Sequence, residues 1–60
     1  MTVTLRCRLI QIVGPQLLAG SRWNVTRRYE TTAGERWELS DEVGNVVCPA
    51  VKPGLCEVVR

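Results

Sequence analysis

The side chains of this 60-residue chain that could carry out chemistry are three cysteines, six carboxylates and eight basic groups, because histidine is absent. Cys7, Cys48 and Cys56 form no Cys-x-x-Cys pair, whereas zinc sites are usually built from four cysteine or histidine ligands. An odd number of cysteines also fits a disulfide framework poorly. We therefore expect buried, unpaired thiols in a reducing compartment, with no metal site and no cofactor.

The carboxylates do not predict catalysis. Most of them gather around two expected turns, Thr31–Glu35 and Asp41–Asn45, where solvated acids are common. Without histidine, the sequence has no usual general base and nothing that would activate a nucleophile. The segment DEVGN also lacks the alternating ligands and the terminal glutamate of a calcium loop. The sequence therefore predicts a protein that is not an enzyme.

The basic side chains are unevenly distributed along the chain. Residues 1–29 contain five arginines and no acidic residue, whereas residues 30–60 contain three basic and six acidic residues, for a net charge of +2. Such asymmetry can indicate an anionic partner. It is equally explained if the two halves lie together in one fold and neutralise each other.

The first element that would position these arginines is a strand at the N-terminus. Thr2–Leu9 alternates polar and apolar residues, which is typical of a half-buried strand, and it directs Arg6 and Arg8 outward. The apolar phase then slips to Ile10 and Ile12, so we expect a β-bulge or a sharp bend near Leu9–Ile10 that keeps both sets facing the core, and Gly14-Pro15 ends the run. The residues expected to face the core are Val3, Leu5, Cys7 and Leu9, with Leu17 or Leu18 filling one end of it.

Arg22–Glu30 is the second expected strand, and its two faces differ in chemistry. In an extended chain, Arg22 and Arg28 lie on one face, and the two aromatic residues lie on the other. A platform for single-stranded nucleic acid needs aromatic rings exposed beside positive charge. This strand is therefore better explained as part of a core that includes Trp37 from the next strand. The residues expected on the core face are Trp23, Val25 and Tyr29, together with Arg27, which at the end of the strand would reach out past the core.

The rest of the chain completes a small all-β fold. Arg36–Ser40 alternates again and leads through the Asp41–Asn45 turn into a return strand, which Pro49 either ends or places at a sheet edge. A single 3-10 turn over 52–55 and a short last strand over 56–59 follow. We expect one domain over residues 1–60, a five-stranded barrel, because closure removes exposed strand edges. The strand order resembles that of SH3-like barrels.

The segment from Leu18 to Val59 also resembles short SH3-like proteins encoded by bacteriophages and prophages. Those proteins often carry a glycine, an aromatic residue and a valine that open one strand, then an aromatic-x-Leu-x-Asp hairpin turning on Gly-Asn, then a proline. The resemblance implies an SH3-like fold and binding to a host protein that is thereby inhibited or redirected, with no active site. The matching positions are Gly20, Trp23, Val25, Trp37, Leu39, Asp41, Gly44, Asn45 and Pro49.

Two functions of different classes follow from these patterns. The first is a protein-binding module, an accessory protein that binds a host or defence protein through an acidic surface of that protein. The second is a nucleic-acid-binding barrel whose basic face contacts phosphates. Both would use the four arginines expected to point outward from two neighbouring strands, namely Arg6, Arg8, Arg22 and Arg28.

A third, structural explanation is that these arginines pair across strands with Glu30, Glu38 and Glu57. Self-association into a homo-oligomer is compatible with either function, because a basic face on one copy could meet the acidic hairpins of another. Arg6 and Arg8 interrupt the apolar N-terminal run, so we expect no signal peptide, no membrane partner and a cytoplasmic location, in the host cytoplasm if the protein is phage-encoded.

Overall fold

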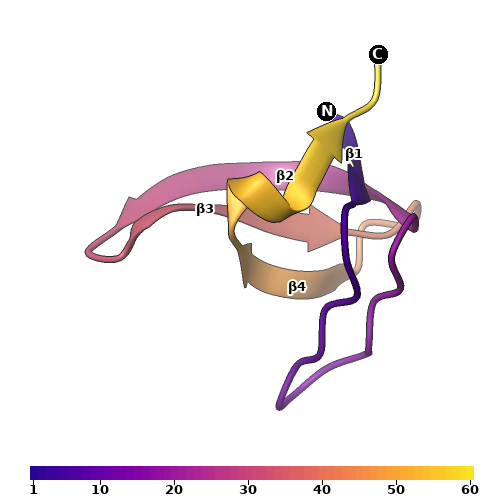
Figure 1. Cartoon of the computed structure of the whole chain (residues 1–60), viewed down its shortest axis with the longest axis horizontal. Coiled ribbons are helices and arrows are strands. Elements are labelled where there is room, and N and C mark those ends of the chain that lie inside the picture. Colours follow the sequence, from indigo (N-terminus) through magenta and orange to yellow (C-terminus); the bar gives the residue numbers. More distant parts are fainter.

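A computed structural model describes residues 1–60 and contains five antiparallel β-strands and one 3-10 helix (Figure 1). The alternating segments of the sequence form these strands, which confirms the all-β prediction. The elements are β1 (Thr2–Leu5), β2 (Arg22–Thr31), β3 (Gly34–Ser40), β4 (Val46–Val51), η1 (Pro53–Leu55) and β5 (Cys56–Val58).

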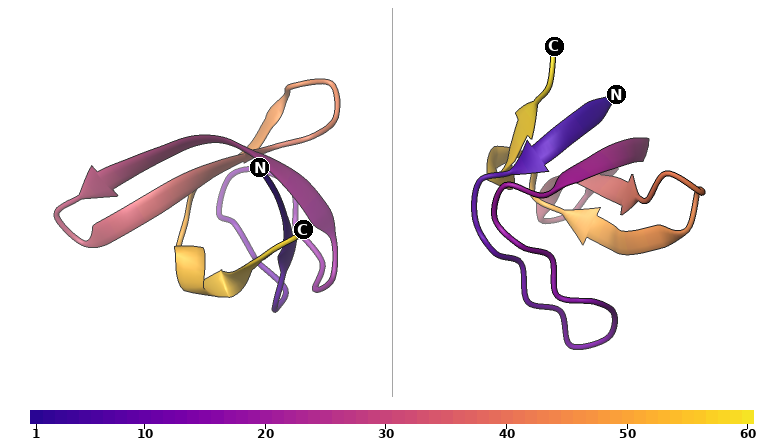
Figure 2. Two further views of the ribbon diagram at one scale, coloured as in Figure 1. Left: turned by 90° about the horizontal axis from the view of Figure 1, so that it is seen from above. Right: turned by 90° about the vertical axis from the view of Figure 1, so that its right-hand side faces the viewer.

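The strands form one open sheet in the order β4-β3-β2-β1-β5. The sheet bends strongly, as the two views of Figure 2 show, but its edge strands β4 and β5 do not pair with each other. β5 is only three residues long and follows η1 directly, so it adds to the far side of β1 and does not reach β4. The barrel closure expected from the sequence is therefore absent.

A small apolar cluster lies inside the bend of the sheet. Eight of the 60 residues are buried, so the core is thin even for a domain of this length. Trp23 and Trp37, which we expected to be largely buried, are half-buried and pack against the edge of the cluster. The buried apolar residues are Val3, Leu5, Leu17, Leu39, Cys48, Val51 and Cys56.

The first strand is shorter than its sequence pattern predicts. β1 ends at Leu5, and residues 6–21 leave the sheet as a long loop, which Figure 1 and the right-hand view of Figure 2 show projecting from the body. Leu9 and Leu17 close this loop with two main-chain hydrogen bonds of 2.8 and 2.9 Å. No β-bulge forms near Leu9–Ile10, because the chain has already bent away from the sheet at Arg6 and Cys7. Cys7, Ile10 and Ile12, which were expected to face the core, are therefore exposed.

Thr26 introduces a β-bulge that the sequence did not reveal. Val25 lies opposite Leu39, but Arg27 lies opposite Glu38, so Thr26 is an extra residue in β2. Directly opposite residues of an antiparallel pair share a face of the sheet. Leu39 is buried, so Glu38, its neighbour in β3, points to the other face, which we call the outer face.

The bulge exchanges the faces of all later residues in β2. Arg27 and Tyr29 lie opposite Glu38 and Arg36 and therefore on the outer face, whereas Arg28 lies opposite Trp37, on the core side. The expectation that Arg27 and Tyr29 share the core face of β2 while Arg28 lies on the opposite face is therefore wrong. A shift of one residue moves every following side chain to the opposite face.

The remaining turns and the edge strand follow the sequence closely. The Asp41–Asn45 turn joins β3 to β4, and Gly44 in it has a positive φ of 96°, which favours glycine. β4 continues through Pro49 at the edge of the sheet, where a missing N–H is tolerated. Leu17 fills one end of the core with 1% of its surface exposed, whereas Leu18 is 62% exposed.

Candidate partner-binding site

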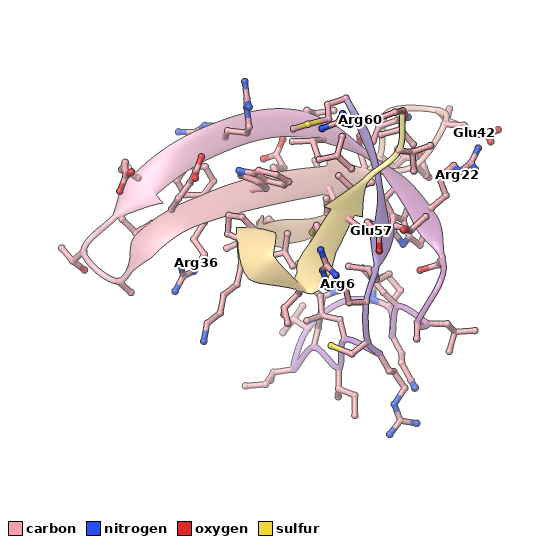
Figure 3. The ribbon with its side chains drawn as sticks, turned by 45° about the horizontal axis from the view of Figure 1, so that its top comes forward. Arg6, Arg22, Arg36, Glu42, Glu57 and Arg60 are labelled. Carbon is pink, nitrogen blue, oxygen red and sulfur yellow. The ribbon has the colours of Figure 1, made fainter.

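The four arginines predicted as a site come from three different parts of the structure. Arg22 begins β2 and lies opposite Thr4, which in turn lies opposite Glu57 of β5, so these three residues share the outer face. Arg6 follows the end of β1, and its guanidinium Nη1 is 3.8 Å from Glu57 Oε2 (Figure 3). Arg8 lies further along the loop and is exposed.

Arg28 does not join the others. It lies beyond the Thr26 bulge, near the far end of β2, and its side chain shares the core-side face of the sheet with Trp37. Arg27 occupies the outer face in its place, with its guanidinium carbon 4.7 Å from the centre of the Tyr29 ring. The structure therefore does not bring the four predicted arginines together on one face of the sheet.

Most of the arginines have no acidic partner within the molecule. The ion pair between Arg6 and Glu57 is the only one within 4.0 Å, and both side chains are largely exposed. Glu38 accepts a hydrogen bond of 2.9 Å from the Thr26 hydroxyl and pairs with no arginine. Of the three acidic residues expected to pair with the arginines across strands, only Glu57 does so, and its partner is Arg6.

The loop formed by residues 6–21 carries an exposed apolar end. Ile10 is 70% exposed, Ile12 is fully exposed and Val13 is 87% exposed; we call these three residues the apolar tip. Leu18, on the returning arm of the same loop, is also exposed. Exposed apolar side chains gathered in one loop are candidates for an interaction site.

One polar side chain holds the loop in place. Gln11 Nε2 donates hydrogen bonds of 2.8 Å to the carbonyl oxygens of Pro15 and Val47, so it ties the loop to itself and to β4. The apolar tip therefore lies on a loop that these two hydrogen bonds hold in place. The sequence pattern predicted that Ile10 and Ile12 face the core, although the Gly14-Pro15 pair that follows them signals a loop, so the tip was not predicted.

A shallow polar pocket lies between the start of β2 and the turn after β3. It has a volume of about 410 Å³ and places the oppositely charged side chains of Arg22 and Glu42 on its walls (Figure 3). The Ser40 hydroxyl oxygen, at its wall, is buried without a hydrogen-bond partner. Ligand pockets are mostly apolar, whereas only Trp23 among the lining residues is hydrophobic.

The three cysteines are unpaired, and only Cys7 is exposed. Cys48 and Cys56 are buried, and burial raises the pKa of the Cys56 thiol above its ordinary value of 9.0, which keeps that thiol protonated. No group of three or more histidine, cysteine, aspartate or glutamate side chains is arranged to hold a metal ion. The structure also has no helix with the length and apolar character needed to span a membrane.

Comparison of the chain with family models, with curated proteins and with solved structures gave no match.

Proposed function

We propose that the protein is a small non-catalytic binding module that docks on another protein through the loop of residues 6–21. The observation that carries this proposal is the exposed apolar tip in the same loop as Arg8, an arginine without an acidic partner in the molecule. A matching surface would be an apolar groove rimmed by acidic residues. Such a surface would bury the tip and attract the arginines during approach.

The aromatic residues favour a protein partner over nucleic acid. Trp23 is half-buried and its indole Nε1 donates a 2.7 Å hydrogen bond to Ser21 Oγ. Tyr29 lies beneath Arg27, and its hydroxyl donates a 2.6 Å hydrogen bond to the Pro49 carbonyl. No aromatic ring is therefore displayed beside the loop arginines as a stacking platform for bases.

The same proposal takes the fold to be SH3-like. The strand order, the long loop after β1 and the 3-10 helix before β5 are compatible with an incompletely closed barrel of that kind. With the resemblance of the sequence pattern to small phage proteins, we propose an accessory protein that inhibits or redirects a host or defence protein in the host cytoplasm.

The test is capture of partners from bacterial lysate with wild-type protein and matched variants. Ile12→Asp in the apolar tip should abolish capture of the partner, whereas Val43→Asp, at a position in the β3–β4 turn that is 85% exposed, should not. Arg8→Glu should weaken binding, whereas Arg60→Glu should have little effect. Capture that Ile12→Asp and Arg8→Glu leave unchanged would contradict the proposal.

A salt titration distinguishes the nucleic-acid-binding alternative from the protein-binding proposal. Phosphate contacts make affinity fall steeply with salt. Binding of duplex or single-stranded nucleic acid at about 50 mM salt, lost at higher salt and lost in Arg8→Glu, would replace the protein-binding proposal.

A further inference from the structure

Residues 26–31 of β2 have one hydrogen-bonding edge along which no other strand lies. β1 pairs only with residues 22–24 of β2, and the Met1 carbonyl accepts a 2.7 Å hydrogen bond from the Val25 amide. Residues 26–31 pair with β3 on one side only. This part of the β2–β3 hairpin projects beyond the rest of the sheet (Figure 1). A free strand edge is a template for pairing with another strand.

The other free edges of the sheet are less suited to pairing. β4 is interrupted by Pro49, which has no N–H, and the carbonyl of Pro49 already accepts the Tyr29 hydroxyl. β5 is only three residues long. The free edge of β2 covers six residues without proline, so it is the longest uninterrupted edge of the molecule.

The bulge determines which main-chain groups face this edge. The Val25 amide points toward β1, that is, away from β3. Main-chain groups alternate between the two sides of a strand, and the extra residue Thr26 shifts that alternation by one. Arg28 and Glu30 therefore direct their N–H and C=O groups to the free edge.

We propose that a second copy of the chain pairs antiparallel along this edge, about a two-fold axis at Tyr29. In that register Arg28 of each copy lies opposite Glu30 of the other, on the same face of the continuous sheet, and forms two cross-strand ion pairs. If the partner strand slides by two residues in either direction, its side chains stay on the same faces of the sheet. Arg28 then lies opposite Arg28 of the other copy, or Glu30 lies opposite Glu30. Like charges directly opposite each other are unfavourable, so the charges select one register.

Space and stability are both compatible with this dimer. A hollow of about 300 Å³ lies at the start of the free edge, between Met1 and residues 25–28, so the N-terminus does not fill the approach to it. A domain with only eight buried residues has little core of its own, and oligomerisation is a common way to stabilise domains of this size. The interface is isologous, as most homodimer interfaces are, and it is separate from the apolar tip.

A charge-swap experiment tests the pairing. Sedimentation of the wild-type protein up to about 1 mM should show a dimer. Arg28→Glu and Glu30→Arg, each made alone, should weaken dimerisation by about tenfold or more, because two attractive pairs become repulsive. The double variant R28E/E30R should restore it. Glu42→Arg changes the charge by the same amount in the β3–β4 turn and should leave dimerisation unchanged.

Cross-linking tests the register independently. With Cys7→Ser removing the exposed native thiol, Tyr29→Cys should form a disulfide-linked dimer, because the two introduced thiols face each other at the axis. Arg27→Cys in the same background should not, because its counterpart lies about 13 Å away along the strand. A wild-type protein that is monomeric throughout, single variants that dimerise normally, a double variant that stays monomeric, or equal cross-linking at both positions would each overturn the proposal.

Discussion

At the scale of the residue, stability depends on a few side chains, because the apolar cluster has only seven members. Two neighbouring leucines illustrate the consequence. Leu17 comes from the long loop yet lies fully inside the cluster, whereas the next residue, Leu18, faces solvent. A residue outside the sheet is therefore as much a part of the core as the residues of β1 and β3.

Leu17→Ala should destabilise the fold by about 2–5 kcal/mol, because it removes buried methyl groups and leaves a cavity. Leu18→Ala should change the free energy of unfolding by less than about 0.5 kcal/mol. Urea denaturation followed by tryptophan fluorescence compares the two. Equal losses would show that the loop does not pack on the sheet as described.

The thiols should differ in reactivity and in their effect on stability at high pH. Cys7 is exposed and should react rapidly with a thiol reagent, whereas Cys48 and Cys56 should react only after unfolding. Burial raises the pKa of Cys56, so its thiol keeps its proton in the folded state at a pH where the unfolded chain loses it. Stability from this group is therefore present below pH 9.0 and is lost as pH rises above it.

Denaturation of the wild type and of Cys56→Ala at neutral and alkaline pH compares their free energies of unfolding. The variant should lose less stability than the wild type between the two conditions. Rapid modification of all three thiols in the folded protein would contradict the assigned burial.

At the scale of the element, the period-two pattern predicted most of the sheet and failed where the chain changes phase. Alternation located β2 and β3, and the glycine and proline residues located the turns and the edge strand. The same pattern extended the first strand to Leu9, because Cys7 and Leu9 continue the alternation although the chain turns away after Leu5. The periodicity of a sequence reflects the local preference for an extended strand, whereas the strand in the structure ends where its partner strands end.

The candidate site was predictable in part for the same reason. The sequence identified the exposed arginines, but the Thr26 bulge placed Arg28 on the face opposite Arg22. A bulge without glycine has no clear sequence signature, since the extra residue is set by the register of two strands. The apolar tip was missed because isoleucines in a loop resemble isoleucines in a strand.

The β3–β4 turn should make stability sensitive to acid. Asp41 Oδ1 accepts hydrogen bonds from the amides of Asn45 at 2.9 Å and Val43 at 3.0 Å. These bonds, the one from Asn45 first, lower the pKa of Asp41 below its ordinary value of 3.8. A depressed pKa contributes stability above the unfolded value and loses it as pH falls through the folded value.

Asp41→Asn removes that titration. The variant should be less stable than the wild type at neutral pH, and the difference should shrink below pH 3.8. Thermal unfolding at several pH values measures it. A difference that is the same at pH 7 and in acid would assign the role of Asp41 to packing and not to its charge.

At the scale of the whole molecule, the structure holds its charges apart and leaves most of them unpaired. The arginines of the first half lie on both faces of the sheet and in the loop, and one exposed ion pair joins the halves. The neutralisation that the two oppositely charged halves could have provided is therefore mostly absent. The basic groups remain available to partners, including the second copy proposed for the β2 edge.

This arrangement predicts that monomer stability depends weakly on salt. Exposed ion pairs contribute about 0–1 kcal/mol, and the separated arginines are largely screened from one another by water and ions. Raising sodium chloride from about 0.05 to about 1 M shortens the screening length to about 3 Å. The melting temperature, measured at dilution where the protein is monomeric, should move by less than about 4 °C. Glu57→Gln, which removes the single pair, should show the same small change. A much larger rise with salt would mean that repulsion among the arginines already destabilises the free monomer, so that a partner would relieve strain as well as add contacts.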